Sequence, residues 1–286
     1  MDCLSQMNVI YDVQTKTYWA AMRPSSRPVI TRELLKDMRS VQDTIAEILN
    51  DNHQHVEYLV LRSEQPGVFN LGGDLHLFAD RIRAKDRAGL QAYAYACIDV
   101  LYRNARAFDA PMVTIALVQG DALGGGFETA LSFDVIVAER GAKMGLPEVL
   151  FNLFPGMGAY SFLSRKIGMA AAEKLIMSGK VYSAEELYEL GVVNVLADPG
   201  DGVNAVTDYI ARSRRKGNSY RAMSRVKRQV NPVTFDELRK IVDIWVDAAL
   251  QLGEQDLKKM SRLTSAQLRR FTDTQPEADT AIQDAA

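Results

Sequence analysis

The chain has 286 residues, of which 47% are hydrophobic and 24% are charged, and its formal net charge at pH 7 is −2. These values are typical of a soluble globular protein and exclude a disordered chain or a protein that coats nucleic acid. The two cysteines, Cys3 and Cys97, are too few for a disulfide framework and lack metal-ligand spacing. No signal-like segment begins the sequence, and no window reaches the ~18 apolar residues of a membrane-spanning helix. We therefore expect a cytoplasmic protein with no membrane span, no bound metal and no nucleic-acid partner.

Strands and helices alternate in the predicted structure of the first part of the chain. Residues 7–22 contain two β-prone runs around a polar turn, which is the pattern of a hairpin. Thr31 is placed to cap a helix that runs to about residue 50, because apolar residues then recur at helical spacing. A short buried strand over 58–61 and a glycine-rich loop over 66–75 follow.

The middle of the chain leads from a helix into a run of glycines. A helix is predicted over residues 86–108, and a proline marks the break after it. The predicted strand 112–118 then enters the sequence GDALGGGFE, residues 120–128. Beyond it we expect a short helix and two extended runs, at 134–138 and 143–145.

From about residue 157 nearly the whole chain is predicted to be helical. Ser183 and Glu186 form a capping box that begins one of these helices. Residues 235–252 carry a broad apolar stripe, which can pack against a partner subunit or equally on the core of its own chain. The predicted organisation is a core with an N-terminal hairpin over residues 1–200, a helical region over 201–271 and a disordered acidic tail over 272–286.

The three consecutive glycines of GDALGGGFE stand between a strand and a helix. Glycine favours neither element, so the run needs a local reason. Close packing of the helix on the strand is one reason. The other is that such a turn exposes backbone N–H groups to an anion without a side chain in the way. The sequence lacks the Lys-Ser/Thr of a Walker loop and the spacing of a dinucleotide-binding loop, so the oxyanion or enolate of a thioester is the better candidate.

Two glutamates lie near this turn in the sequence. Glu128 falls in the first turn of the helix after the glycines, and Glu148 falls in a later loop. A carboxyl group in apolar surroundings has a raised pKa and can serve as a general acid or base. The structural alternatives are a helix-dipole partner for Glu128 and a solvated position for Glu148. The sequence contains no G-x-S-x-G motif, the turn that carries a serine nucleophile. The histidines lie outside the glycine run. We expect His53 and His55 to be solvated at a helix end, and the role of His76 is ambiguous between a structural and a site residue.

Residues 120–168 resemble the signature region of the crotonase (enoyl-CoA hydratase/isomerase) superfamily. In that family a strand, three glycines, a helix with one glutamate and a Pro-Glu loop followed by Pro-Gly recur in this order. Glu128 and Glu148 stand 20 residues apart, which is similar to the hydratase branch, where both are retained. The resemblance implies an α/β crotonase fold, a spiral of ββα units with a C-terminal helical oligomerisation region.

The same resemblance implies roles for individual residues. The loop FNLGGDL is similar to the second oxyanion-hole loop of the family, so the N–H groups of Gly73 and Gly125 are implied to bind the thioester oxygen. Glu128 and Glu148 are then the acid/base pair. Position 73 is more often alanine in the family, a departure that keeps the N–H group. No cofactor is implied beyond the phosphopantetheine or coenzyme A that carries the substrate, and the expected substrate-binding residues are Gly72, Leu146, Leu150, Phe154 and Met157.

A narrower resemblance is to the diffusible signal factor synthases, and it rests on the N-terminal hairpin, the LGGDL loop and the segment FPGMGAYSFLSRK. It implies dehydration of a 3-hydroxyacyl thioester on acyl carrier protein, followed by hydrolysis to a cis-2-unsaturated fatty acid that serves in quorum sensing. The alternatives are an enoyl-CoA hydratase or isomerase of fatty-acid degradation and a non-catalytic partner-binding module. Family membership also implies a homotrimer or dimer of trimers and a regulatory sensor protein as a partner.

Residues 212–228 concentrate arginine and lysine without any acidic residue. Such a run is commonly a solvated helix face. It can also form a landing surface for an acidic acyl carrier protein or for the phosphates of coenzyme A, with Arg214 and Arg215 as the residues to test.

Overall fold

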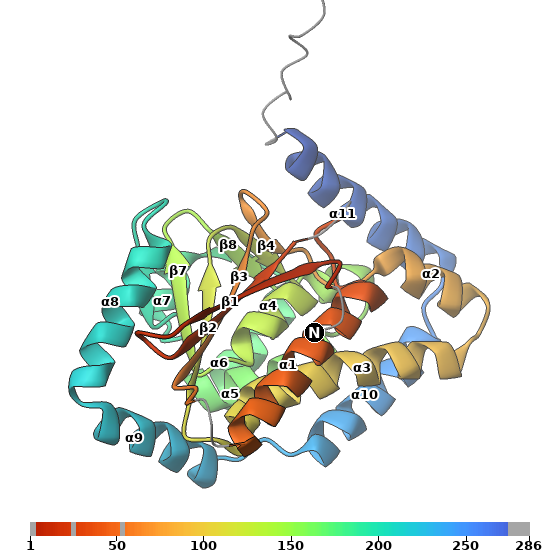
Figure 1. Cartoon of the computed structure of the whole chain (residues 1–286). Coiled ribbons are helices and arrows are strands. Elements are labelled where there is room, and N and C mark those ends of the chain that lie inside the picture. The colour runs from red at the N-terminus through yellow and green to blue at the C-terminus, as the bar shows by residue number, and fades with distance from the viewer. Residues whose placement is uncertain (1–3, 24–26, 52–54, 274–286) are drawn as a thin grey trace, which may run out of the picture.

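The computed structural model describes residues 4–23, 27–51 and 55–273, and for residues 266–273 only the backbone. Its strands form two sheets, and helices surround them (Figure 1). The larger sheet has the order β1 (Met7–Asp12), β2 (Thr17–Met22), β3 (Tyr58–Ser63), β5 (Val113–Val118), β7 (Val135–Glu139) and β10 (Val195–Ala197). The smaller sheet has the order β4 (Val68–Asn70), β6 (Asp121–Leu123), β8 (Lys143–Gly145) and β9 (Val181–Ser183). The predicted α/β class is confirmed.

The strands are mostly parallel, because helices connect them. The β1–β2 hairpin and the β8–β9 pair are antiparallel, and the remaining pairs are parallel. The helices are α1 (Arg32–Asp51), α2 (Leu75–Arg83), α3 (Arg87–Arg106), α4 (Gly125–Leu131), α5 (Ala159–Ile167), α6 (Met169–Ser178), α7 (Ala184–Glu189), α8 (Gly202–Arg215), α9 (Gly217–Val230), α10 (Phe235–Ala249) and α11 (Glu254–Asp273). Short 3-10 helices are η1 (Ala107–Asp109) and η2 (Pro147–Phe151).

The chain follows the same path three times. In the pairs β3 and β4, β5 and β6, and β7 and β8, the first strand joins the larger sheet and the second joins the smaller one. A helical segment comes after each pair: α2, α4 and η2. This repetition is the expected spiral of ββα units, and it places the ends of β4, β6 and β8 side by side.

The larger sheet has a core on each face. Val113, Ile115 and Leu117 of β5 pack with apolar residues of α8, whereas the intervening Ala116 and Val118 belong to the larger core on the other face. This alternation is the period-two pattern of a strand that is buried on both sides. Figure 1 shows α8 on one side of the sheet and α1, α3 and α10 on the other.

Several local predictions are confirmed by side-chain contacts. The β1–β2 hairpin forms as expected. The Leu34 N–H donates to the Thr31 hydroxyl at 3.0 Å, which caps α1. Ser183 and Glu186 form both bonds of the capping box that begins α7. These features depend on neighbours in sequence, so the sequence is sufficient to predict them.

Other elements differ from the prediction. The described chain beyond residue 157 is mostly helical, as expected, but the short strands β9 and β10 also lie there. Strands of three residues are too short to show alternation. For the same reason the pattern does not reveal β4 inside the predicted glycine-rich loop, or β6 inside GDALGGGFE. Asp74 accepts from the Leu77 N–H and caps α2, another element absent from the prediction.

The apolar stripe over residues 235–252 packs within its own chain. Five of its residues on α10 are buried: Leu238, Val242, Trp245, Val246 and Ala249. Gln91 and Tyr95 of α3 both bond to Asp243, which fixes α10 along α3. Of the two alternatives for this stripe, packing on the core of the same chain is therefore the observed one, and the oligomeric state stays a prediction. Residues 274–286, most of the predicted acidic tail, lie outside the described residues.

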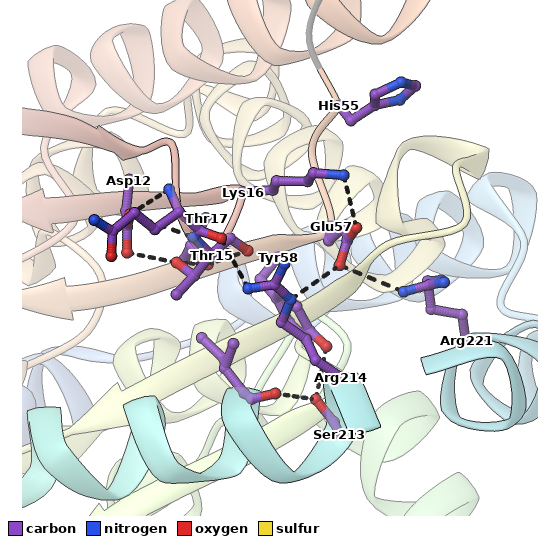
Figure 2. Close-up of polar contacts among 12 residues, drawn as sticks. Asp12, Thr15, Lys16, Thr17, His55, Glu57, Tyr58, Ser213, Arg214 and Arg221 are labelled. Atoms are coloured by element: carbon purple, nitrogen blue, oxygen red, sulfur yellow. Dashed lines mark hydrogen bonds and ion pairs between the residues drawn. The ribbon is translucent and has the colours of Figure 1, made fainter. Parts of the chain in front are cut away.

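The arginines of the predicted basic run hold the edge of the fold together. Lys16, Arg214 and Arg221 all approach the carboxylate of Glu57, at 3.2, 3.7 and 3.4 Å (Figure 2). We call this group of four side chains the Glu57 hub. It joins the hairpin turn, the start of β3, and helices α8 and α9. Arg228, further along α9, pairs with Asp134 at 3.3 Å. Three arginines of the run are thus in ion pairs within the chain.

The Glu57 hub leads to a prediction about stability. Glu57→Gln leaves three cations around a neutral amide, so we expect the free energy of unfolding to fall by roughly 1–2 kcal/mol at low salt. The loss should shrink at high salt, where the ion pairs of the wild type are screened. Urea unfolding at two salt concentrations measures this, with Glu47→Gln, an exposed position on α1, as the control. Equal stability of Glu57→Gln and wild type at low salt would show that the hub contributes nothing.

Candidate active site

The glycine run lets two backbone segments touch. A Cβ added to Gly126 would lie 2.1 Å from the carbonyl oxygen of Asn70, and a Cβ on Gly72 would lie 2.8 Å from that of Leu123. Gly124 has φ +51°, a conformation that glycine adopts without strain. Close packing, one of the two explanations of the glycines, is therefore observed at this contact. The segment after β4 lies directly against the start of α4.

This contact brings together the two predicted N–H donors. A Cβ on Gly125 would lie 3.4 Å from the backbone nitrogen of Gly73. Among the described residues, neither the Gly73 N–H nor the Gly125 N–H has a hydrogen-bond acceptor. The neighbouring groups are engaged, because the Gly72 N–H donates to the Asn70 side chain at 2.8 Å and the Gly72 carbonyl accepts from Ile30 at 2.7 Å. Two free donors thus remain beside each other.

Both donors line a narrow cavity that is mostly apolar. Its walls come from the segment after β4, from α2, α3, α4 and η2, from the loop before α5, and from α10. The lining residues are Gly73, Leu75, Phe78, Tyr93, Ala94, Gly125, Glu128, Glu148, Phe151, Leu153, Gly156, Met157 and Trp245. The cavity therefore contains both predicted glutamates and both predicted N–H donors.

Glu128 is almost completely buried, at 1% exposed. Its Oε1 accepts hydrogen bonds from the backbone N–H groups of Met157 at 2.7 Å and Ala159 at 3.0 Å. Burial raises the pKa of the Glu128 carboxyl, and these two hydrogen bonds act in the opposite direction because they stabilise its ionised form. The side chain is thus held in one orientation by the loop that leads into α5.

Glu148 lies on the 3-10 helix η2, where we expected a loop. Its Oε2 is buried and has no hydrogen-bond partner among the described residues. Its Oε1 faces the glycine turn, because a Cβ added to Gly124 would lie 2.7 Å from that oxygen. Burial raises the pKa of the Glu148 carboxyl, and the nearby charge of Glu128 raises it further. Both effects favour the neutral form of Glu148.

Only some of the predicted substrate-binding residues lie at the cavity. Met157 lines the cavity, and Gly72 lies behind Gly73 in the contact with α4. Leu146 is fully buried in the core, and Phe154 is partly buried against it. Leu150 is 49% exposed, because η2 directs its side chain outward toward Gly179. These three leucine and phenylalanine side chains are absent from the cavity wall.

The two histidines in the described part of the chain, His55 and His76, do not line the cavity. His76 is exposed on α2, and His55 is exposed beside the Glu57 hub (Figure 2). His53 lies outside the described residues. In the part of the chain that the structure describes, no group of three or more His, Cys, Asp or Glu residues is placed to hold a metal ion. Within the same part, every helix is too short or too polar to cross a bilayer.

Sequence reasoning missed the aromatic wall of the cavity. Phe78 contacts Tyr93 and Trp245 in edge-on arrangements, with ring centroids 5.2 and 5.1 Å apart. The three rings come from α2, α3 and α10, which are far apart in the sequence. A Cβ on Gly73 would lie 2.8 Å from the Phe78 ring, so Phe78 explains why position 73 is glycine in this chain.

Comparison with known proteins assigns this site to a family. The sequence profile described as enoyl-CoA hydratase/isomerase matches residues 22–276. The chain belongs to the enoyl-CoA hydratase/isomerase family. A probable mitochondrial enoyl-CoA hydratase 2 of Arabidopsis thaliana is 31% identical over 68% of this chain and 61% of its own length. Crotonyl-CoA hydratase of Syntrophomonas wolfei is 28% identical over 88% of this chain and 92% of its own length.

Other relatives match this chain over a smaller share of their own length, and the solved structures show similarity of fold alone. The match spans about half the length of several curated relatives, such as 49% of rat methylglutaconyl-CoA hydratase. An enoyl-CoA hydratase from Bacillus halodurans superposes on 90% of the chain with a TM-score of 0.75 and 20% identity. Pseudomonas aeruginosa DspI superposes on 96% with a TM-score of 0.62 and 23% identity. The crotonase fold is thereby confirmed.

The raised pKa of Glu148 predicts a pH-dependent gain in stability when that residue is replaced. Its pKa is higher in the folded protein than in the unfolded chain, so the folded state holds the extra proton and the free energy of unfolding falls as the pH rises through this window. Glu148→Gln cannot lose that proton. We expect it to be more stable than wild type at alkaline pH, by about 1.4 kcal/mol for each unit of pKa elevation.

Urea unfolding across a pH series measures this gain, which should shrink as the pH falls toward the ordinary carboxyl range. Glu47→Gln on α1 is again the control, since it changes an exposed glutamate. A stability difference that is the same at every pH would contradict the burial of an ionisable Glu148.

Proposed function

We propose that the protein moves water across the C2–C3 bond of an acyl thioester. The observation that carries this proposal is the convergence of two buried carboxyl groups and two free N–H donors on one narrow apolar cavity. Such donors stabilise an enolate oxygen, and addition or loss of water needs a proton transfer at each of two carbons. Several relatives are named as enoyl-CoA hydratases, which supports the same chemistry.

The two glutamates have different environments, which suggests different roles. In the dehydration direction, the thioester oxygen accepts hydrogen bonds from Gly73 and Gly125. Glu128 takes the C2 proton as a carboxylate, because two backbone N–H groups stabilise that form. The electron pair of the C2–H bond moves onto the carbonyl as an enolate. The C2–C3 double bond then forms, the C3–O bond breaks, and Glu148 gives its proton to the leaving hydroxyl, which departs as water.

A finer proposal is that the dehydration serves the synthesis of a cis-2-unsaturated fatty acid from a substrate on acyl carrier protein. Its support is the segment FPGMGAYSFLSRK, which differs from the usual family sequence and supplies both N–H groups that bind Glu128. For hydrolysis, a carboxylate deprotonates a water, which attacks the thioester carbon. Gly73 and Gly125 hold the tetrahedral oxyanion, the C–S bond breaks, and the thiol leaves with the proton. Degradative enoyl-CoA hydration is the alternative, and the names of the relatives favour it.

The basic run contributes no residue to the wall of the cavity. It covers the end of α8 and most of α9, and α8 packs on the face of the larger sheet opposite to α3 and α10. Figure 1 shows α9 far from α2, which forms part of the cavity wall. The landing-surface hypothesis for Arg214 and Arg215 is therefore not part of this proposal.

Product analysis separates the candidate functions. Purified protein receives a medium-chain 3-hydroxyacyl thioester, on coenzyme A or on acyl carrier protein, and products are identified by mass spectrometry. Free cis-2-enoic acid supports the synthase. A trans-2-enoyl thioester in equilibrium with its hydrate supports the hydratase. If the protein converts neither substrate, the non-catalytic binding module remains as the candidate.

Replacing either glutamate tests the two-carboxylate mechanism. We expect Glu128→Gln and Glu148→Gln to lower kcat by about 10²–10⁴, the usual contribution of a general acid or base. Glu47→Gln, remote from the cavity, should match wild type. Full activity in either cavity variant would contradict the proposed role of that glutamate.

A further inference from the structure

Tyr93 connects the two segments on either side of Gly73. It lies on α3, is 3% exposed and is one of the residues that line the cavity. The hydroxyl donates to the backbone carbonyl of Ile30 and accepts from the backbone N–H of Asp74 at 3.3 Å. Ile30 in turn donates its N–H to the carbonyl of Gly72 at 2.7 Å. One hydroxyl therefore bonds to the residue after Gly73 and to Ile30, which forms an isolated β-bridge with Gly73.

These bonds determine where the Gly73 N–H points. The Gly72 carbonyl and the Gly73 N–H belong to one planar trans peptide, so a bond that fixes the carbonyl also fixes the N–H. The peptide is otherwise free to turn, because Gly72 has φ +98° and two glycines stand in succession. The N–H of Ile30 holds the Gly72 carbonyl through a hydrogen bond, and the Tyr93 hydroxyl bonds to the backbone of both Ile30 and Asp74.

We propose that the Tyr93 hydroxyl is a positioning group for the oxyanion donor at Gly73, acting through Ile30 and Asp74. The inference rests on the proposed function, since it concerns the same site. Tyr93 acts without giving or taking a proton, because its hydroxyl is already engaged by two backbone groups and by the buried thiol of Cys97. The competing explanation is that Tyr93 only packs against Phe78, with ring planes at 82°.

Tyr93→Phe separates the two explanations, because it keeps the ring and removes the hydroxyl. We expect kcat to fall by roughly 10–100-fold with KM changed only a few-fold. The reason is that a misplaced donor loses more of its interaction with the transition state than with the bound substrate. A bound 2,4-dienoyl thioester should also show a smaller red shift of its absorbance, because its carbonyl is less polarised.

Tyr95→Phe is the matched control. Tyr95 lies two residues further along α3, and its hydroxyl donates to Asp243 at 2.7 Å and accepts from Gln91 at 3.1 Å. The substitution removes a comparable pair of hydrogen bonds that do not involve Gly73. It should affect stability while leaving kcat and the red shift at wild-type values.

The outcomes distinguish the positioning role from the function itself. Wild-type kcat and red shift in Tyr93→Phe would overturn the positioning role, and so would equal losses in the two variants. The amide resonance of Gly73 in glycine-labelled protein gives a readout that needs no activity: it should move in Tyr93→Phe and stay in Tyr95→Phe. If wild type turns over no thioester, the proposed function fails, and this resonance still decides whether Tyr93 orients Gly73.

Discussion

The contact between Gly126 and the backbone of Asn70 is the constraint on which the rest of the site depends. A side chain at position 126 would overlap the Asn70 carbonyl, so the two segments approach as closely as bare backbone allows. This approach sets the start of α4 against the residues that follow β4. The N–H groups of Gly73 and Gly125 become neighbours as a result, although 52 positions separate them in the sequence. The spiral of ββα units supplies the two segments, and the glycines allow them to meet.

The second constraint is electrostatic. Two carboxyl groups are buried near one another, and burial alone disfavours the charged form of each. The chain offsets this cost at Glu128 with two backbone N–H groups and leaves one oxygen of Glu148 without a partner. The two carboxyl groups therefore have different environments. A buried polar atom without a partner destabilises the fold, and such atoms are found where a ligand supplies the missing contact.

The sequence was sufficient to predict which polar groups meet at the site and insufficient to predict its walls. Glu128, Glu148, Gly73 and Gly125 lie in short motifs whose spacing is itself informative. Phe78, Tyr93 and Trp245 look like ordinary core residues in the sequence, and only the packing of α2, α3 and α10 brings their rings together. Leu150 shows the opposite error, since closeness in sequence to Glu148 did not place its side chain in the cavity.

The position of Trp245 has a consequence for how the protein is made. Its ring lies against Gly156, where a Cβ would come within 2.4 Å of it, and so covers the loop that holds Glu128. During synthesis the glycine turn and both glutamates leave the ribosome well before α10 does. Until α10 has been made, the part of the cavity wall that Trp245 supplies is missing. A fragment that stops before α10 would contain every predicted catalytic group and lack the enclosure in which their pKa values are raised.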